Sequence, residues 1–308
     1  MPASRPEPDA AHAAAAGGGR PARTLRTYLA FVKFEHTLFA LPFAYAGMVL
    51  AARGWPGWVT FAWITLAMVG ARTAAMAVNR VVDAEIDARN PRTRGREIPS
   101  GRLRRRDGLA LAAAGFAALA WAGWSLNPLT FALLPLAVAF MVVYPYTKRL
   151  TWACHAWLGV TIGAAAAGGA IGVTGRMDLQ AITLWLAVAA WIGGFDVVYG
   201  LLDLEVDRRQ GIQSVPARFG PAVALRVAAW AHAVSLLTLI GLAAVTPLGA
   251  LYLVVVILGV GPILALQHLL LRRRGVAAAL RAFNANLWVS GLVLLGVTLD
   301  LAGFAGAL

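Results

Sequence analysis

The chain has 308 residues, of which 60% are hydrophobic and 13% charged, and its formal net charge is +13. Soluble domains have about 45–50% apolar and about 25% charged residues, so this composition excludes an ordinary soluble protein. The apolar runs are about twenty residues long, which indicates membrane-spanning helices rather than the roughly ten-residue strands of a membrane barrel. The basic residues lie in loops at alternate ends of these runs, which argues against a nucleic-acid partner. A single cysteine, Cys154, excludes an internal disulfide and a multi-cysteine metal site.

The first part of the chain differs in composition from the rest. Residues 1–24 are rich in Ala, Gly, Pro and Arg, a composition typical of disorder. No apolar region follows closely enough to form a cleaved signal peptide. We therefore expect a disordered basic tail over residues 1–27 and a single transmembrane domain over residues 28–308.

The hydrophobic pattern predicts an all-α, polytopic membrane protein with nine transmembrane helices. Each predicted span is an apolar run bounded by polar loops. The predicted spans are residues 33–52, 58–82, 107–126, 129–146, 152–174, 179–201, 220–244, 248–270 and 283–304.

Lys and Arg are distributed unevenly between the loops. The loop over residues 83–106 has eight Arg, and the loops after the fourth, sixth and eighth spans are also basic. The opposite side holds Arg53 and Arg176 and little else. Because basic loops stay in the cytoplasm, this asymmetry places the N-terminus and the acidic loops there and the C-terminus outside. We expect a multi-pass protein of the cytoplasmic (inner) membrane.

Carboxylates are rare and concentrated in two short segments. The chain has 14 Asp and Glu, and eight of them lie within residues 83–97 or 196–207. The first reads NRVVDAEID, with Asn79, Asp83 and Asp87 four residues apart, and the second reads DLEVD, with Asp203 and Asp207. Carboxylates beside apolar spans are costly to keep and usually mark a functional site. Two clusters of hard oxygen ligands are what Mg²⁺ needs to hold a phosphorylated substrate.

Helical periodicity extends both motifs toward the membrane. Positions i, i+4 and i+7 share a helix face, so Arg72 lies on the stripe of the first motif. Asp196 and Tyr199 lie on the stripe of the second motif for the same reason. The spacing of seven and then four residues recurs at an offset of 124 residues, starting from Arg72 and from Asp196. This recurrence predicts two related halves whose polar stripes face a common cavity.

The alternative explanation of these carboxylates is structural, because an Asp at a helix end can cap the helix or pair with Arg in a solvated loop. Two stripes that each enter an apolar span favour a functional site, since buried charges are expensive. Glu85 and Glu205 point away from the stripes, and we predict that they are solvent-exposed partners of the Arg-rich loops. The histidines that lack metal-like spacing are interpreted as packing or interface residues: His36, His155, His232 and His268.

The segment YPYTKR ends the fourth predicted span and contains Tyr144, Lys148 and Arg149. A phenol and two cations at the cytoplasmic edge suit a phosphate-rich leaving group. Considered alone, such a segment is more often an aromatic and basic membrane anchor. Beside two acidic motifs, the phosphate role is favoured. Arg92 and Arg96 follow the first motif directly and could reach the same phosphate.

Taken together, these motifs resemble those of the UbiA family of intramembrane prenyltransferases. The resemblance rests on NRVVDAEIDARNPRTRGREIPSGR, YPYTKR and DVVYGLLDLEVD and covers about residues 28–304. The opening KFEHTLFALPFAYAGM is similar to the ubiquinone/menaquinone branch, the 4-hydroxybenzoate polyprenyltransferases. It most resembles the subset thought to prenylate 1,4-dihydroxy-6-naphthoate in the futalosine route to menaquinone. One departure is Gln213, at a position where the family commonly has Lys.

The resemblance implies nine transmembrane helices around a central cavity, with a lateral opening for a lipid tail. It also implies a polyprenyl diphosphate donor bound through Mg²⁺, an aromatic hydroxy acid acceptor and contact with membrane lipid. The implied metal ligands are Asn79, Asp83, Asp87, Asp203 and Asp207. The residues assigned to the diphosphate are Lys148, Arg149, Arg92, Arg96 and Tyr199. The residues assigned to catalysis are Asp196, Arg72 and Tyr144.

The reaction implied by this resemblance begins when Mg²⁺ ions neutralise the diphosphate and the C1–O bond breaks with allylic-cation character. An electron-rich ring carbon, ortho to a phenolic hydroxyl, then attacks. The protein stabilises the leaving anion and excludes water from the cation. In this hypothesis Asp196 orients or deprotonates the acceptor hydroxyl, and Arg72 pairs with the acceptor carboxylate.

Rival functions are open at this level. Within the family, the acceptor could instead be haem, chlorophyll or a glycerol-phosphate lipid. A secondary transporter also carries charges within its spans, but it does not need two metal-type motifs on one face. A membrane CDP-alcohol phosphotransferase would show a DG followed closely by AR and spaced Asp residues, whereas Asp107-Gly108 is followed only by apolar residues.

Overall fold

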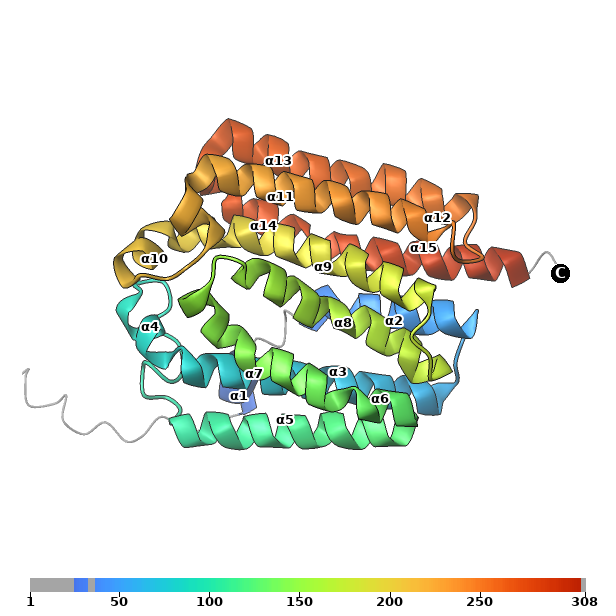
Figure 1. Ribbon diagram of the computed structural model, residues 1–308, viewed down its shortest axis with the longest axis horizontal. Coiled ribbons are helices and arrows are strands. Elements are labelled where there is room, and N and C mark those ends of the chain that lie inside the picture. The colour runs from blue at the N-terminus through green and yellow to red at the C-terminus, as the bar shows by residue number, and fades with distance from the viewer. Residues whose placement is uncertain (1–24, 33–36, 306–308) are drawn as a thin grey trace, which may run out of the picture.

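Long apolar helices account for nearly all of the structure. The computed structural model describes residues 25–32 and 37–305, and the regular elements in that part of the chain are all helical. The long helices run side by side, with α4 and α10 at one end of the bundle and the turn before α12 at the other (Figure 1). The predicted all-α class is therefore confirmed.

The helices follow one another with short connections, except for the loop over residues 90–104 between α4 and α5. Those of the first half are α1 (Leu25–Phe31), α2 (Thr37–Ala52), α3 (Trp58–Val82), α4 (Ala84–Arg89), α5 (Arg105–Leu126), α6 (Pro128–Ala132) and α7 (Leu134–Leu150). Those of the second half are α8 (Cys154–Thr174), α9 (Leu179–Gly200), the 3₁₀ turn η4 (Leu201–Asp203), α10 (Leu204–Gln210), α11 (Val215–Leu242), α12 (Ala250–Val255), the π-helical turn η5 (Val256–Val260), α13 (Gly261–Arg274), the 3₁₀ turn η6 (Gly275–Ala278), α14 (Ala279–Ala285) and α15 (Leu287–Ala305).

Seven helical stretches in the described part of the chain are long and apolar enough to cross a membrane. Six of them match, in order, the predicted spans from 58–82 to 220–244. The seventh, Ala250–Gly303, has 54 residues and covers most of the last two predicted spans. The first predicted span corresponds to the shorter apolar helix α2, and its residues 33–36 lie outside the described part. A polytopic helical membrane protein is confirmed, and the number nine stays a prediction.

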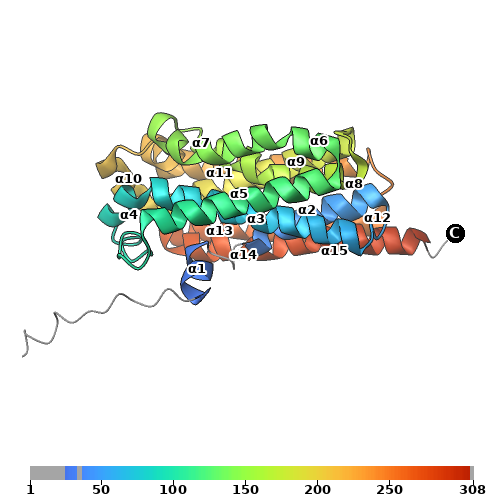
Figure 2. The same ribbon diagram turned by 90° about the horizontal axis from the view of Figure 1, so that it is seen from below.

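The N-terminal segment is described only in part. Most of the predicted tail, residues 1–24, lies outside the described residues, as does His36. Residues 25–27, which the prediction also placed in the tail, form the first turn of α1. Figure 2 shows the bundle from a second side, with α1 below it, near the half of the molecule that carries α4 and α10.

The helices pack as a chain of neighbouring pairs. Helix α3 packs along α5, α2 packs along both α8 and α15, and α9 lies between α8 and α11. Trp191 and Tyr252 are the largest fully buried side chains of the main core, which joins α2, α9, α12 and α15. The site described below therefore rests on a scaffold whose apolar packing is continuous along the bundle.

Glycines on α8 allow unusually close contact with its neighbours. A Cβ added to Gly159 would lie 2.2 Å from the carbonyl oxygen of Ala189 on α9. A Cβ on Gly47 of α2 would lie 2.1 Å from the carbonyl oxygen of Ala166, and Gly169 faces α2 in the same way. Small residues that let backbones touch are typical of helix packing in membranes. The positions of α2, α8 and α9 relative to one another are therefore tightly constrained.

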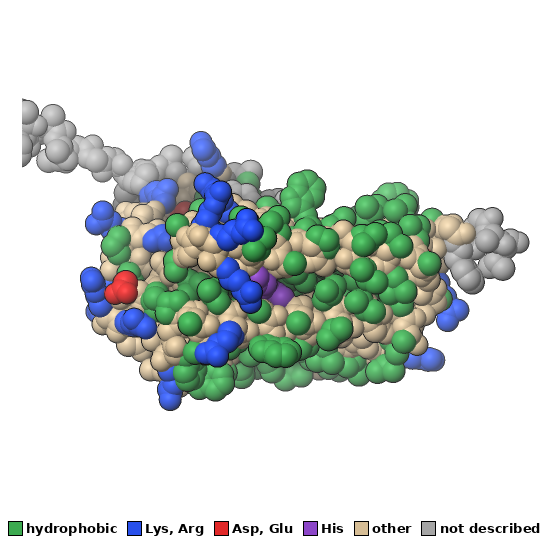
Figure 3. Space-filling model, turned by 90° about the horizontal axis from the view of Figure 1, so that it is seen from above, with side chains coloured by type: hydrophobic (Ala, Val, Ile, Leu, Met, Phe, Trp, Pro, Cys, Tyr) green, Lys and Arg blue, Asp and Glu red, His purple; other side chains and the backbone are tan. Residues whose placement is uncertain are grey.

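The outer surface is apolar along the helices and basic at one end. Trp58 is 75% exposed and Trp230 is 74% exposed, as expected for side chains that meet lipid rather than water. On the face seen in Figure 3, Lys and Arg gather toward one end, and the rest of the surface is mainly hydrophobic. The uneven distribution of charge in the sequence is thus visible in the folded molecule.

Candidate active site

Both acidic motifs lie at a break in a long helix. Helix α3 ends at Val82, and Asp83 (φ −88°, ψ 3°) is both its C-terminal cap and the residue before α4. In the second half, Asp203 (φ −108°, ψ 5°) precedes α10 in the same way. The sequence predicted one continuous helical stripe for each motif, and both stripes are instead interrupted at the Asp. These two breaks are 120 residues apart (203 minus 83), so they pair Asp83 with Asp203 rather than follow the offset of 124.

Asp83 is the most deeply buried carboxylate of the first motif, with an exposed fraction of 1%. Asn79, one turn earlier, donates a hydrogen bond from Nδ2 to its Oδ2 at 3.1 Å. Lys148 forms an ion pair with the same oxygen, and Arg149 Nη2 lies 3.4 Å from Oδ1. Arg149 also donates to the carbonyl oxygen of Val82 at 2.9 Å. The end of α7 thus supplies two of the four cations that the sequence assigned to the diphosphate.

Asp87 faces the loop that follows α4. Arg96 Nη1 donates to both of its carboxylate oxygens at 2.8 Å. The hydroxyl of Thr93 donates to the Asp87 carbonyl oxygen at 3.1 Å. A buried ion pair between Arg80 and Glu97, at 3.0 Å, holds the far side of the same loop against α3. The loop over residues 90–97 is therefore attached to both ends of the first motif.

The same loop reaches across to the second motif. Asn90 donates from Nδ2 to Oδ1 of Asp203 at 2.9 Å. Arg92 forms an ion pair with Asp203 and donates from Nη1 to the Tyr199 hydroxyl at 2.8 Å. Its guanidinium carbon also lies 5.1 Å from the centre of the Tyr199 ring. Burial alone would lower the pKa of Arg92, but its hydrogen bonds to Asp203 and Tyr199 raise the pKa above its usual value, so the side chain stays charged.

Asp207, the last predicted metal ligand, lies on α10. Its Oδ2 accepts a hydrogen bond from the Ser214 hydroxyl at 3.2 Å. The backbone N–H of Gln213 donates to the carbonyl oxygen of Lys148 at 2.6 Å. The residue that departs from the family pattern therefore contacts the basic end of α7 through its backbone.

The three residues assigned to catalysis lie close together on α3, α7 and α9. Tyr144 is within electrostatic range of Arg72, Asp83 and Asp196. The Nε of Arg72 is buried and has no hydrogen-bond partner among the described residues. An unpaired guanidinium N–H in the interior is suited to a polar group of a bound molecule.

His155 was interpreted as a packing or interface residue, and the structure adds a contact with Asp196 that this interpretation did not include. Its Nδ1 lies 2.6 Å from Oδ2 of Asp196, and its Nε2 accepts a hydrogen bond from the backbone N–H of Val215 at 3.3 Å. Because Nε2 accepts, the proton of a neutral ring is on Nδ1 and is donated to Asp196. His155 therefore fixes the orientation of the predicted catalytic carboxylate.

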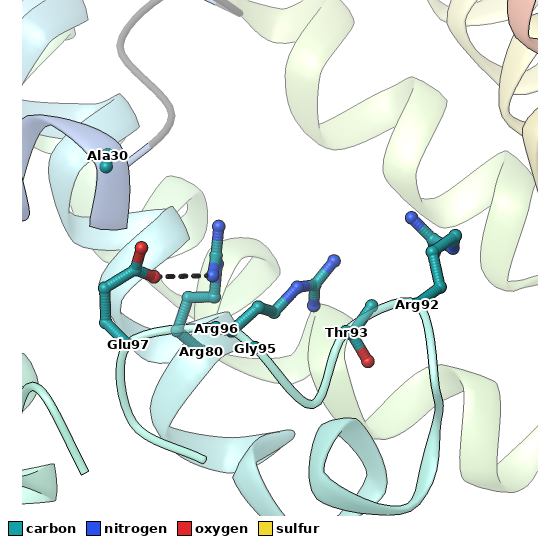
Figure 4. Close-up of a pocket in the computed structure, with 7 residues that line it drawn as sticks. All are labelled: Ala30, Arg80, Arg92, Thr93, Gly95, Arg96 and Glu97. Carbon is teal, nitrogen blue, oxygen red and sulfur yellow. Dashed lines mark hydrogen bonds and ion pairs between the residues drawn. The ribbon is translucent and has the colours of Figure 1, made fainter. Parts of the chain in front are cut away.

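A cavity of about 360 Å³ opens beside the loop. Its lining residues are Ala30, Arg80, Arg92, Thr93, Gly95, Arg96 and Glu97. In Figure 4 the guanidinium group of Arg80, which comes from α3, lies on the same side of the loop as those of Arg92 and Arg96, and the dashed line marks the pairing of Arg80 with Glu97. The predicted residues Arg92 and Arg96 thus reach one basic cavity, whereas Arg72, Tyr144 and Asp196 do not line it.

The donor atoms of the predicted metal site are the carboxylate and amide oxygens of Asn79, Asp83, Asp87, Asp203 and Asp207. The described residues contain no group of three or more His, Cys, Asp or Glu side chains arranged to hold a metal ion. Asp83, Asp87 and Asp203 are paired with Lys or Arg side chains instead. Their chemistry nevertheless fits Mg²⁺, which prefers carboxylate oxygens from one or two residues together with substrate phosphates. The hydrogen bond between Asn90 and Asp203 also links the loop that follows the first motif to the second motif.

Several functional candidates were missed by sequence reasoning. Arg80 and Glu97 lie in or beside an Arg-rich stretch, where the sequence does not indicate which Arg is buried. Asn90 was passed over because it belongs to neither spaced motif. The partner of His155 lies 41 residues further along the chain. The signal that could have found Arg80 is its position three residues after Ala77 and six after Ala74, on the face of α3 that is buried rather than lipid-facing.

Comparison with known proteins identifies the class. The model of the UbiA prenyltransferase family matches residues 40–290. A 4-hydroxybenzoate octaprenyltransferase of Alkalilimnicola ehrlichii is 30% identical over 83% of this chain and 86% of its own length. A protoheme IX farnesyltransferase of Thermus thermophilus is 35% identical over 83% of this chain but only 42% of its own length. The chain belongs to the UbiA prenyltransferase family and is a prenyltransferase, which confirms the expected enzyme over a transporter.

Solved structures agree with this assignment. The apo structure of a UbiA homologue from Aeropyrum pernix K1 has a TM-score of 0.79 and 33% identity, and covers 87% of this chain and 98% of its own. A UbiA homologue from Archaeoglobus fulgidus bound to GPP and Mg²⁺ has a TM-score of 0.70 and 15% identity over 90% of this chain and 99% of its own. At that identity the second structure supports the fold alone.

Proposed function

We propose that this enzyme transfers a polyprenyl chain from polyprenyl diphosphate to an aromatic hydroxy acid, with Mg²⁺ as cofactor, in quinone biosynthesis. The observation that carries the proposal is the bridge that Asn90 and Arg92 make to Asp203. This bridge links the loop that follows the first acidic motif to the second motif, and Lys or Arg side chains pair with Asp83, Asp87 and Asp203. Such a site matches a ligand that carries both negative charge and metal ions, as a diphosphate does.

The cations of the site are assigned to the diphosphate. Lys148 and Arg149 come from the end of α7, and Arg92 and Arg96 come from the loop after α4. Arginine offers a planar fork that binds two phosphate oxygens together. Tyr199 is assigned to the same group because its hydroxyl accepts a hydrogen bond from Arg92. These residues hold the donor and stabilise charge on the departing diphosphate.

The metal ligands are assigned to the oxygen atoms of the two motifs. When bound, Mg²⁺ supplies positive charge that neutralises the leaving diphosphate. The ligands that we propose are Asn79, Asp83, Asp87, Asp203 and Asp207. For these carboxylates to reach a metal, the Lys and Arg side chains that now pair with them must turn toward phosphate oxygens.

The acceptor is assigned to the interior, next to Asp196, Tyr144 and Arg72. His155 holds one carboxylate oxygen of Asp196, which leaves the other oxygen free to orient a phenolic hydroxyl. The unpaired Nε of Arg72 is suited to the carboxylate of the acceptor. The apolar surroundings exclude water from the allylic cation while the ring carbon attacks.

Two acceptors are compatible with the sequence, 4-hydroxybenzoate and 1,4-dihydroxy-6-naphthoate. The named 4-hydroxybenzoate octaprenyltransferases support the first, because the chain covers most of their length. The opening segment of the chain favours the second. Haem is the alternative acceptor, favoured by the 35% identity to a protoheme IX farnesyltransferase. We place the enzyme in the cytoplasmic (inner) membrane, with the N-terminus and the acidic motifs on the cytoplasmic side.

A membrane assay with Mg²⁺ and a polyprenyl diphosphate would test this function. The three acceptors, 4-hydroxybenzoate, 1,4-dihydroxy-6-naphthoate and protohaem, are offered separately to the wild type and to the variants Asp83→Ala and Asp203→Ala. Glu205→Ala is the matched control, since it removes an exposed carboxylate from the same helix turn as Asp203. We expect prenylated product from one of the two aromatic acids, lost with EDTA and in both Asp variants but kept in the control.

Other outcomes would change the proposal. Product from protohaem alone would replace the aromatic acid by haem. No product from any acceptor, with Mg²⁺-dependent binding of the donor intact, would keep the donor site and reject all three acceptors. Loss of donor binding in the Glu205→Ala control as well would show that the effect is not specific to the motifs.

A further inference from the structure

A second basic pocket lies on the outer face of the bundle, between α11 and α13. Its volume is about 210 Å³, and its lining residues are Ala222, Leu225, Arg226, Ala229, His268 and Arg272. Figure 3 looks onto this face, where histidine lies in a hollow flanked by Lys or Arg and surrounded by hydrophobic side chains. Neither α11 nor α13 carries a residue assigned to the candidate active site, so the pocket is a separate feature.

The polar side chains of the pocket are cationic or hydrogen-bonding groups without a carboxylate beside them. Arg226 and Arg272 are both exposed, and in the described part of the chain neither forms an ion pair with Asp or Glu. His268 Nε2 lies 2.8 Å from Nδ1 of the buried His232. This contact fixes the orientation of the His268 ring. It uses Nε2 of His268 and does not involve its Nδ1. The pocket therefore offers two guanidinium groups and an oriented imidazole to an anion.

The surroundings of the pocket are those of a lipid-facing surface. Its other walls are Ala and Leu side chains, and Trp230, Leu266 and Leu269 on the same two helices are exposed. Arg272 lies in the last turn of α13, and α11 begins at the same end of the molecule (Figure 1). The pocket is thus near one end of the spans, where a phospholipid phosphate would lie with its acyl chains along the helices.

We propose that this pocket binds the phosphate-bearing headgroup of an anionic phospholipid. Uncompensated Arg side chains on a membrane-facing helix are costly unless an anion pairs with them. Basic pockets between transmembrane helices are suited to anionic headgroups, and Arg binds phosphate through two parallel hydrogen bonds. The apolar walls match the acyl chains, which a soluble anion does not have. The inference does not depend on the function proposed for the acidic motifs.

Native mass spectrometry of the full chain in detergent would test this site. Phosphatidylglycerol and phosphatidylcholine of equal acyl length are titrated separately onto the wild type and onto the double variant Arg226→Gln/Arg272→Gln. The matched control is Arg273→Gln/Arg274→Gln, which removes the same charge from neighbouring positions that do not line the pocket. Inorganic phosphate at millimolar concentration is added as a competitor. Thermal unfolding in detergent shows whether each variant keeps its fold. The variant Arg226→Lys/Arg272→Lys keeps the positive charge and removes only the guanidinium groups.

We expect the wild type to retain phosphatidylglycerol over phosphatidylcholine, and the pocket variant to bind it about tenfold more weakly. The control should stay within about twofold, the Lys variant should be intermediate, and phosphate should not displace the lipid. Equal losses in the two Gln variants would overturn the proposal in favour of a general charge effect. Displacement by inorganic phosphate would overturn the lipid assignment in favour of a soluble anion. The proposal would also be overturned if the pocket variant bound both lipids as tightly as the wild type but had a different oligomeric state. This face would then be a contact between copies of the chain.

Discussion

The two acidic motifs occupy equivalent positions at helix breaks, yet they are stabilised by different parts of the molecule. The side chain of Asp83 is 2% exposed, and its cations come from the end of a transmembrane helix, α7. The side chain of Asp203 is 16% exposed, and its partners Asn90 and Arg92 come from a loop. One motif is therefore fixed by the rigid scaffold, while the other depends on the conformation of the loop over residues 90–97.

This difference indicates how the two halves are brought together. The loop belongs to the first half of the chain, but its Arg92 completes the surroundings of Asp203 in the second half. Arg80 and Glu97 anchor the loop from below. A change in the loop should therefore affect Asp203 and Asp87, which the loop contacts, before it affects Asp83, which α7 holds.

The largest effect is expected from replacing the motif carboxylates. Both Asp83→Asn and Asp203→Asn should lower kcat by about 10²–10³, because each removes charge stabilisation at the leaving group. Asp83→Asn should also lower the free energy of unfolding by about 2–3 kcal/mol, since it leaves Lys148 without a counter-ion in a largely buried place. Asp203→Asn should cost less stability because the ion pair of Asp203 with Arg92 is more exposed than the pair of Asp83 with Lys148. Product formation and thermal unfolding in detergent measure the two quantities.

The comparison between the motifs would be contradicted if Asp203→Asn were the more destabilising variant. Removal of divalent metal with EDTA should abolish the activity of the wild type, and added Mg²⁺ should restore it. Restoration in the wild type but not in either variant would support a role of both motifs in holding the metal.

The next largest effect is expected from releasing the loop. Glu97→Gln leaves Arg80 as a buried charge without a partner, which typically costs about 3–5 kcal/mol. Trypsin cleavage after the Arg residues of the loop should therefore become roughly a hundredfold faster, because cleavage follows the population of open loop. Glu85→Gln is the control, since it makes the same chemical change on an exposed pair with Arg105. Equal acceleration in both variants would show that Glu97 does not hold the loop.

A moderate effect is expected from Arg92→Lys. Lysine keeps the charge but cannot bind Asp203 and Tyr199 together, so the KM for the donor should rise about tenfold. The raised pKa of Arg92 means that its ion pair would be lost only as pH rises through that value, well above the assay range. The contribution of Arg92 should therefore be constant between pH 5 and pH 9 (roughly the usual range of assays). If the KM of the wild type and the KM of Arg92→Lys both changed with pH in this interval, and by the same factor, a titrating group other than Arg92 would be responsible.

The smallest effect is expected from Glu85→Gln. Glu85 is exposed and pairs with Arg105 at 2.7 Å, and its hydrogen bond to Arg105 lowers the pKa of its carboxyl. Exposed pairs contribute little, so activity should stay within about twofold of the wild type. A larger loss in the steady-state assay would mean that the acidic surface outside the motifs also takes part in binding.

The sequence identified site residues whose side chains are costly to bury, and it did not identify contacts between residues that are far apart in the chain. The carboxylates Asp83 and Asp203 stood out because charges are rare beside apolar spans, and the exposed pairing of Glu85 was predicted correctly. The predicted span 58–82 ends where α3 ends, but the stripe drawn through Asp83 assumed uninterrupted helical spacing, because the cap keeps the hydrogen bond from Asp83 N to Asn79 O. A pattern of four residues does not distinguish a bent helix from a straight one.

The pairing of charges could not be read from the sequence. Eight Arg lie in the loop over residues 83–106, and nothing in their order indicates that Arg92 crosses to the second half while Arg96 stays with Asp87. The role of His155 depends on α8 packing along α9, which brings it to Asp196. Such contacts follow from tertiary packing, and local periodicity contains no information about them.

The close contacts of α8 with α2 and α9 have a consequence for the membrane in which the enzyme works. Because Gly47 and Gly159 let backbone touch backbone, these helices have no room to slide along one another. In a bilayer that is thicker or thinner than the apolar band of the protein, the three helices must therefore tilt together, or the lipid must deform. We expect the spacing between Asp196 and His155 to be preserved across bilayers of different acyl length, so that the thickness of the host membrane sets the tilt of the enzyme and not the geometry of its interior.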